Sequence, residues 1–321
     1  MRIHLLLSLV LLATPGLGAK EKSKAAAKTS SPVPAADLSA AKSGANAAGT
    51  ARAENDKRAA AAAVPAKPAP APACERCVAV YGDTRTGEEI HKTIVKQLLA
   101  AKPTVVLHTG DFVDKGDKTD QWKSSLSITK DLRAATAFYP IFGNHDVGKD
   151  SGATPFFEAF PALAGQHWYS FERWGTRFIG IDTEAPLAPG TTQYAWLEGK
   201  LASRSLNDRA VVFMHDTVFS SGYHGASEKT KDLPALFEKY KVSLVFTGHD
   251  HVYERSEKDG VVYVVTGGGG APLYPKDKKN PYSKFFASKN HYCMLSITPD
   301  AMRVEAFTPD GKKLDEVIIK K

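Results

Sequence analysis

The chain has 321 residues, 43% of them hydrophobic, and a formal net charge of +7, which is long and apolar enough for a sizeable core. Residues 1–73 carry ten Lys and Arg against four Asp and Glu, a net charge of +6, so residues 74–321 contribute only +1. The basic character therefore belongs to the N-terminal segment, and the remaining composition does not favour a nucleic-acid-binding protein.

Residues 1–19 are predicted to be a signal peptide. Arg2 supplies a positive start, residues 5–13 an apolar stretch, and residues 16–19 a small-residue cleavage site. The apolar stretch is shorter than a bilayer-spanning helix, so we expect no transmembrane span in the mature chain. The expectation is an exported protein, periplasmic or extracellular, and a retained N-terminal anchor is the alternative.

Residues 20–73 consist mainly of Ala, Lys, Pro and Ser, which bury too little apolar surface to fold. We interpret them as a disordered tether that contacts an anionic envelope polymer or lipid, or simply as a solvated linker. Residues 74–321 are then one domain. Its cysteines, Cys74, Cys77 and Cys293, permit one disulfide after export, and the sequence leaves the pairing open.

Strands and helices alternate along most of this domain. An apolar spacing of Ile90, Ile94, Leu98 and Leu99 predicts a helix over 88–101. Further helices are predicted near 119–136, 155–160, 192–204 and 232–240, and a hairpin at 168–182. Strands are predicted at 78–82, 104–109, 210–215, 242–247, 261–266, 291–297, 301–307 and 315–319, and another strand ends at 142. This order predicts an α/β fold, a layered α/β/β/α sandwich of mixed sheets with helices outside.

Polar residues follow the predicted strands at the positions where α/β folds place ligands. The six candidate metal ligands are Asp83, Asp111, Asn144, His215, His249 and His251. Carboxylate, amide and imidazole donors without a thiolate suit Mn, Fe or Zn, and a carboxylate such as Asp111 can bridge two ions. The alternative is a set of polar strand-end residues that holds no metal.

Taken together in this order, the motifs resemble the calcineurin-like metallophosphoesterase superfamily, and within it the purple acid phosphatase branch. The resemblance spans about residues 78–307 and rests on Gly82-Asp83-Thr84-Arg85, Gly110-Asp111-Phe112-Val113-Asp114, Gly143-Asn144-His145-Asp146, Val212-Phe213-Met214-His215 and Gly248-His249-Asp250-His251-Val252-Tyr253-Glu254-Arg255. The set is specific, whereas each motif alone is not.

The resemblance implies a role for each matching residue. It assigns Asp83 and His251 to a first metal, a bridging position to Asp111, and Asn144, His215 and His249 to a second metal. It places His145 beside the substrate as the catalytic acid, with a supporting role as the alternative. It also assigns His224 to substrate binding, although a loop histidine is often only solvated.

Two positions depart from the family pattern. Arg85 stands where the superfamily has a histidine ligand, and Asp114 where the purple branch has a tyrosine. The first metal therefore lacks a ligand, which His91 could supply from the start of its helix. The alternatives are an additional water ligand, a weak or empty first site, or a His91 that is simply solvated. Arg85 is then free to bind the phosphate of a substrate.

The predicted function is metal-dependent hydrolysis of phosphoric esters by a water that two ions activate. One alternative is a degenerate, non-catalytic domain of the cell envelope that binds a metal or an anion. Another is a phosphodiesterase acting on a lipid or nucleotide. The sequence does not identify the substrate.

Overall fold

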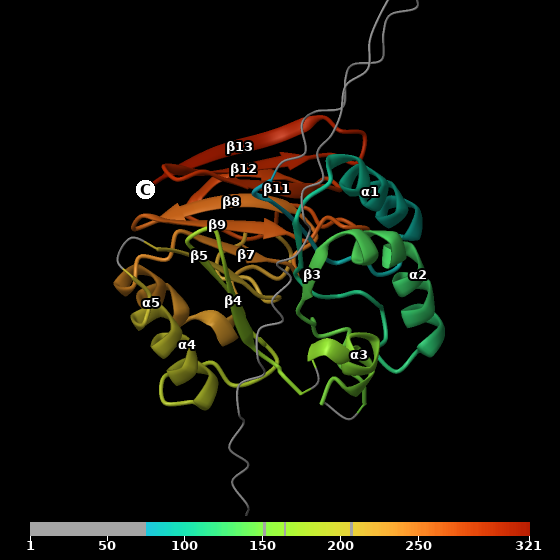
Figure 1. Cartoon of the computed structure of the whole chain (residues 1–321), viewed down its shortest axis with the longest axis horizontal. Helices are drawn as coiled ribbons and strands as arrows, with labels where there is room; N and C mark the ends of the chain where they lie inside the picture. The colour runs from blue at the N-terminus through green and yellow to red at the C-terminus, as the bar shows by residue number, and fades with distance from the viewer. Residues whose placement is uncertain (1–74, 150–151, 164, 206–207) are drawn as a thin grey trace, which may run out of the picture. The chain divides into compact units, whose positions relative to one another are not determined.

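The computed structural model describes residues 75–149, 152–163, 165–205 and 208–321. These residues belong to one compact unit of two mixed β-sheets with helices packed against them (Figure 1). The predicted α/β sandwich of mixed sheets is therefore confirmed. The predicted signal peptide and tether, and Cys74, lie outside the described residues.

The first sheet has the strand order β13-β12-β11-β1-β2-β3. Its strands are β1 (Cys77–Tyr81), β2 (Val105–His108), β3 (Ala137–Pro140), β11 (Tyr292–Ile297), β12 (Ala301–Phe307) and β13 (Lys313–Lys320). The strands β1, β2 and β3 run parallel, in register from Val78 with Val105 and from Val105 with Ala137. The loops that follow these three strands therefore emerge at the same edge of the sheet.

The second sheet has the order β10-β8-β9-β7-β6-β5-β4. Its strands are β4 (Tyr169–Arg173), β5 (Thr176–Gly180), β6 (Arg209–Phe213), β7 (Leu244–Thr247), β8 (Tyr253–Lys258), β9 (Val261–Thr266) and β10 (Ser283–Ala287). Here β5, β6, β7 and β9 are parallel neighbours. The loops after β6 and β7 thus also emerge at a common edge.

The helices cover the sheets from outside. They are α1 (Glu88–Ala101), α2 (Thr119–Ala135), α3 (Thr154–Ala159), α4 (Thr192–Ala202) and α5 (Leu233–Lys239). Side chains from both sheets, such as Val80 and Val212, share one buried cluster that also takes in α4 and α5. A separate cluster joins β1 and β2 to α1 through Ile94 and Leu98. Burial of these apolar faces stabilises the layers.

Most predicted elements agree with the structure. The predicted helix over 88–101 and the strands 261–266 and 301–307 have the observed bounds, and the hairpin is β4–β5. Two strands, β8 and β10, were not predicted. They pair antiparallel with each other, and β8 also pairs with β9, so their place depends on partners far along the chain.

The expected disulfide involves Cys77, while Cys293 is a free, buried thiol.

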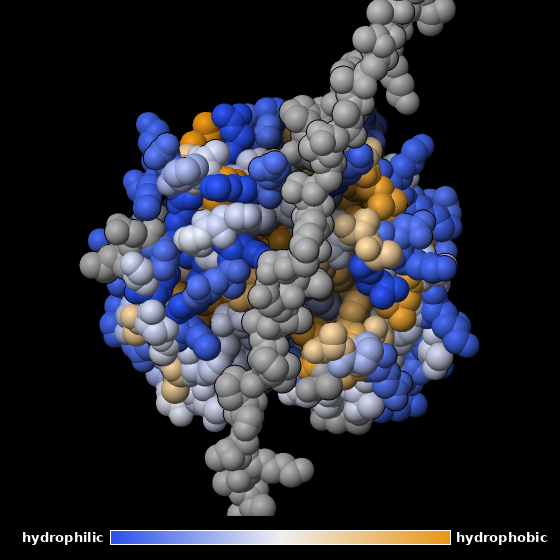
Figure 2. All heavy atoms as spheres, viewed as in Figure 1, coloured by the Kyte–Doolittle hydropathy of each residue, from blue (hydrophilic) through white to orange (hydrophobic). Residues whose placement is uncertain are grey.

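Among the described residues, no helix is both long and apolar enough to cross a bilayer. The face seen in Figure 2 is mostly hydrophilic, with the more hydrophobic residues gathered on the side of α1, α2 and α3.

Candidate metal centre

Three of the predicted ligands lie in one buried group at the ends of β1, β2 and β7. Potential ligand atoms of Asp83, Asp111 and His251 all lie within 4.8 Å of one another. His251 Nε2 is 3.6 Å from a carboxylate oxygen of Asp83. Two carboxylates and an imidazole at this spacing form a donor set that suits a divalent or trivalent metal ion.

The other three predicted ligands converge beside this group. His215 Nε2 lies 3.0 Å from Asn144 Oδ1 and 3.3 Å from His249 Nδ1, and the last two atoms are 3.2 Å apart. His215 Nε2 is also 3.5 Å from an oxygen of Asp111. Asp111 therefore adjoins both groups, which is the position that a bridging carboxylate requires.

Backbone carbonyls orient two of the imidazoles. Nδ1 of His215 lies 2.9 Å from the Thr109 carbonyl, and Nδ1 of His251 lies 2.6 Å from the Pro272 carbonyl. Only an N–H can donate to a carbonyl, so each ring carries a proton on Nδ1 and presents Nε2 to the acidic residues. A hydrogen bond from Nδ1–H to a carbonyl is the arrangement that orients a histidine to bind a metal through Nε2.

Three of the ligand positions have a left-handed backbone. The φ angles are 56° at Asp83, 58° at Asp111 and 67° at His249. This conformation costs a non-glycine residue on the order of 1–2 kcal/mol. Strain at several adjoining positions is typical of a functional site that the surrounding fold keeps in place.

Gly143 allows the ligands to approach one another. A Cβ atom on this residue would lie 2.2 Å from Asp111 Oδ1 and 2.6 Å from His215 Cε1. Both distances are far shorter than a van der Waals contact. The glycine is therefore required because side chains of two ligands occupy the space beside its Cα.

The electrostatics of the group favour a bound cation. Burial, with the nearby Asp111 carboxylate adding to it, raises the pKa of Asp83 well above its usual range. Burial alone would lower the pKa of His215, but the Asp111 and Asp83 carboxylates outweigh it and raise that pKa to about 9. Buried carboxylates are stable when they are paired or coordinate metals, so the residues present fit a metal centre.

Arg85 and His145 both contact Asp114 at the rim of the centre. Arg85 Nη1 donates to Asp114 Oδ1 at 2.9 Å, and Arg85 Nε lies 3.4 Å from Asp111 Oδ2. His145 Nδ1 lies 2.7 Å from the Asp114 carbonyl oxygen. The backbone N–H of His145 donates to Asp111 Oδ1 at 3.1 Å. Both predicted substrate-side groups therefore lie beside the same carboxylate ligand.

His224 also reaches the centre. Its ring centroid is 4.2 Å from that of His249. Tyr274, which is not a predicted site residue, stacks on His251 with the ring centroids 4.2 Å apart, and its ring centroid lies 5.4 Å from that of His224. Tyr274 lies in an irregular segment between β9 and β10 with no motif around it, so nothing in the sequence marked it.

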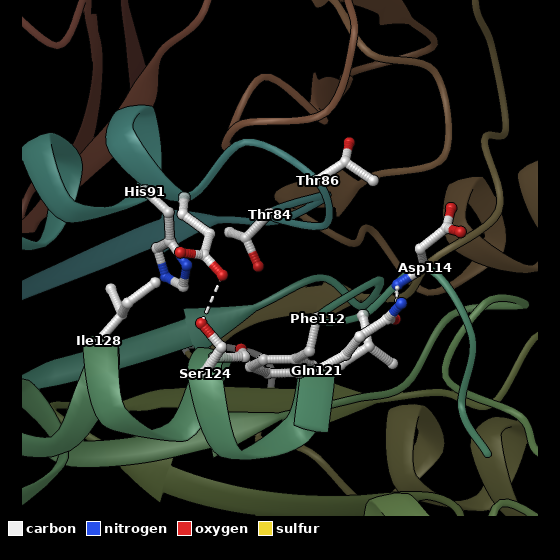
Figure 3. A pocket seen from close by; sticks show the side chains of 11 residues that line it. Thr84, Thr86, His91, Phe112, Asp114, Gln121, Ser124 and Ile128 are labelled. Atoms are coloured by element: carbon white, nitrogen blue, oxygen red, sulfur yellow. Dashed lines mark hydrogen bonds between the residues drawn. The ribbon is translucent and has the colours of Figure 1, made fainter. Parts of the chain in front are cut away.

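His91 is not brought to the other candidate ligands. It is 1% exposed, and its Nε2 lies 3.4 Å from the Tyr81 hydroxyl. Figure 3 shows its ring pointing into the space between α1 and α2. The buried face of α1 consists of His91, Ile94, Val95 and Leu98. The helical spacing of these residues in the sequence already indicates that the His91 side chain is buried with them.

Two acidic residues beside the ligands hold the loops in place. Asp146 accepts hydrogen bonds from the backbone N–H groups of residues 111, 112, 113 and 143. Burial raises the pKa of Asp146 to about 7. Asp250 accepts from the backbone of residues 224 and 225, so it positions the His224 loop. Asp146 was not among the predicted site residues, although it directly follows His145.

The chain is similar to known phosphoesterases in sequence and in fold. The family model described as calcineurin-like phosphoesterase matches residues 78–253. A probable inactive purple acid phosphatase 1 from Arabidopsis thaliana is 28% identical, over 64% of this chain and 40% of that protein. A purple acid phosphatase from Glycine max is 30% identical, over 62% of this chain and 48% of that protein.

The solved structure of a purple acid phosphatase from yellow lupin (Lupinus luteus) seeds has the same fold. It superposes with a TM-score of 0.67 at 22% identity, over 76% of this chain and 53% of the lupin chain. This chain spans less than half the length of the two curated relatives above. The two curated relatives above carry purple acid phosphatase names. With a family model matched over more than half of its residues, the chain belongs to the calcineurin-like phosphoesterase family.

Proposed function

We propose that this chain hydrolyses phosphate esters at a centre of two metal ions, Mn, Fe or Zn. Asp83 and His251 would hold the first ion, Asn144, His215 and His249 would hold the second, and Asp111 would be shared by both. Bound ions supply an activated water and stabilise the charge that develops on the phosphoryl oxygens. The donor set contains no thiolate, in keeping with these metals.

The protein's own groups orient the ester and move the proton. The Arg85 guanidinium, 13% exposed, binds the phosphoryl oxygens through charge-assisted hydrogen bonds. His145 keeps one N–H on the Asp114 carbonyl, so its protonated ring has Nε2–H to give to the leaving oxygen. His224 binds the substrate beside His249.

One observation carries this proposal. Side-chain atoms of His215, Asn144 and His249 approach one another to 3.0–3.3 Å, next to a carboxylate that also adjoins Asp83 and His251. Acceptor atoms at such distances repel one another unless a proton or a cation lies between them. Six donors in two adjoining groups are the arrangement that two ions need.

The test uses the purified full chain. p-Nitrophenyl phosphate and bis(p-nitrophenyl) phosphate should be hydrolysed, activity should disappear with a chelator, and Mn, Fe or Zn should restore it. The ratio of the two rates separates a phosphatase from a phosphodiesterase. Absence of turnover with every metal and both esters would contradict the proposal.

A second candidate function is a non-catalytic domain that binds one metal or an anion. Its support is Arg85, whose positive charge lies 3.4 Å from Asp111 and lowers the affinity of the first site for a cation. Some similar proteins carry the name "probable inactive". Metal analysis separates the candidates, because the enzyme requires about two ions per chain and the alternative one or none.

We propose, from the sequence of residues 1–73, that the protein is exported and that the basic tether contacts an anionic envelope polymer. N-terminal sequencing of the mature protein should begin near residue 20. A mature protein that still starts at Met1 would contradict export through this signal.

A further inference from the structure

A cavity of about 290 Å³ lies between α1 and α2, beside the loops that follow β1 and β2 (Figure 3). It is lined by Thr84, Thr86, Glu88, His91, Phe112, Val113, Asp114, Gln121, Ser124, Ser125 and Ile128. Ligand pockets of proteins have volumes from about 300 Å³ upward, so this space is of the size that holds a small molecule. A molecule no larger than a monosaccharide fits this volume.

The lining is rich in neutral hydrogen-bonding groups. Ser125 is 5% exposed, and its hydroxyl has no hydrogen-bond partner among the described residues. Gln121 Oε1 accepts the backbone N–H groups of residues 114 and 115, which fixes its amide and leaves the NH₂ group as a donor. Ser124 donates to Glu88 across the cavity. A buried hydroxyl without a partner is costly, so a ligand with hydroxyl groups would stabilise this wall.

The charge of the lining favours an uncharged ligand over an anionic one. Its formally charged residues are the acids Glu88 and Asp114, and no Lys or Arg lines it. Burial lowers the pKa of His91 to about 3, so the imidazole is neutral at neutral pH. Phe112 and Ile128 add apolar surface, which suits the C–H groups of a polyol chain or a sugar ring.

The cavity and the metal centre share the same two loops. Along the loop after β1, Asp83 and Arg85 contact the centre, whereas Thr84 and Thr86 line the cavity. In the loop after β2, Asp114 lines the cavity and also holds Arg85 and His145. A molecule in the cavity therefore lies against the residue that positions both substrate-side groups.

We propose that this cavity is a binding site for a small uncharged polyhydroxylated group, such as a monosaccharide or glycerol. The group is either a free molecule or the alcohol part of the phosphate ester, and only the second source rests on the proposed hydrolysis. Hydroxyls of the ligand bond to Ser125, Gln121 and the Thr84 side chain.

The first experiment measures binding without turnover. Saturation-transfer NMR on the full chain, with glycerol and with D-glucose as probes, should give saturable signals. Ser124→Phe places a ring in the cavity and should weaken binding about tenfold or more, a change of about 1.4 kcal/mol or more. Ser127→Phe, on the exposed face of the same helix, is the matched control and should bind like wild type. Melting temperatures verify that both variants fold.

The second experiment identifies the source of the group. Glycerol phosphate and glucose 6-phosphate are compared with p-nitrophenyl phosphate by kcat/KM in wild type, Ser124→Phe and Ser127→Phe. If glycerol and D-glucose bind and only Ser124→Phe weakens that binding, the site belongs to a free polyol. If wild type prefers the polyol esters over p-nitrophenyl phosphate and only Ser124→Phe removes that preference, the site binds the alcohol part of the ester. Neither effect, or equal effects of the two variants, overturns the site, whereas a loss of turnover alone overturns only the hydrolase proposal.

Discussion

Arg85 and Asp114 form an ion pair, with Nη1 and Oδ1 2.9 Å apart. These are the two positions at which the sequence departs from the family pattern, and in the fold they contact each other. Arg85 Nε also lies 3.4 Å from Asp111. The two departures are therefore one structural change, which places a positive charge beside the candidate ligand Asp111 and anchors it there.

Replacing Arg85 with Ala should raise the KM for p-nitrophenyl phosphate about 10- to 100-fold, because hydrogen bonds to charged groups contribute about 1.5–3 kcal/mol. Asp114→Asn should have a smaller effect, since the guanidinium stays and loses only the negative charge of its partner. Asp117→Asn, in the same loop and near Lys149 instead, is the control. An unchanged KM with increased metal content in Arg85→Ala would show that Arg85 acts on the metal site alone.

Asp111→Asn should reduce the metal content most strongly. Asp111 adjoins both donor groups, and an amide neither carries the negative charge nor bridges two ions well. Loss of a residue that only supports ligands already weakens metal affinity 10–100-fold, so a ligand should cost at least about that much. Plasma mass spectrometry of the dialysed protein measures the loss, and wild-type metal content in Asp111→Asn would contradict the assignment.

Asp146→Asn tests the support of the ligand loops. The carboxylate accepts four backbone N–H groups, whereas an amide has one oxygen and turns an NH₂ group toward donors. We expect a loss of about 1–3 kcal/mol in the free energy of unfolding and weaker metal binding. Urea unfolding of the metal-free protein and metal titration measure the two effects. A change in neither would leave Asp146 without the supporting role.

Gly143→Ala should abolish metal binding by steric overlap. The added Cβ would lie 2.2 Å from Asp111 Oδ1, so one of the ligands must move. Gly199→Ala in α4 is the matched control, because nothing lies within 4 Å of its Cβ position and alanine favours a helix by about 1 kcal/mol. Calorimetric metal titration should separate the two variants, and metal binding by Gly143→Ala as tight as wild type would refute the packing argument.

His91 should make the fold sensitive to acid. Burial lowers its pKa from 6.5 to about 3 in the folded protein, so folding favours the neutral ring. The stabilisation is complete above pH 6.5 and is lost as the pH falls toward 3, by about 2 kcal/mol between pH 8 and pH 5. His91→Gln should reduce this pH dependence of the free energy of unfolding. Identical slopes in both proteins would mean that His91 is protonated without penalty.

The local pattern of the sequence determined most secondary structure and which residues follow each strand. The apolar spacing of α1 is a local signal, because a helix buried on one face repeats its apolar residues at helical spacing. The continuous apolar runs of β1 and β9 are also local signals, because both faces of these strands are buried. The six candidate ligands could be named for the same reason, since each follows a recognisable strand. Strands β8 and β10 were missed because pairing with distant strands defines them.

Tertiary structure decided which side chains face one another across the loops. His91 precedes Ile94 on the buried face of α1, and the docking of α1 against β1 and α2 directs it to the cavity. Arg85 meets Asp114, Asp146 gathers amides from a loop more than thirty residues away, and Tyr274 stacks on His251. Such contacts depend on how the sheets and helices pack. The sequence of this protein thus determined the donors of its site, and the fold decided what surrounds and supports them.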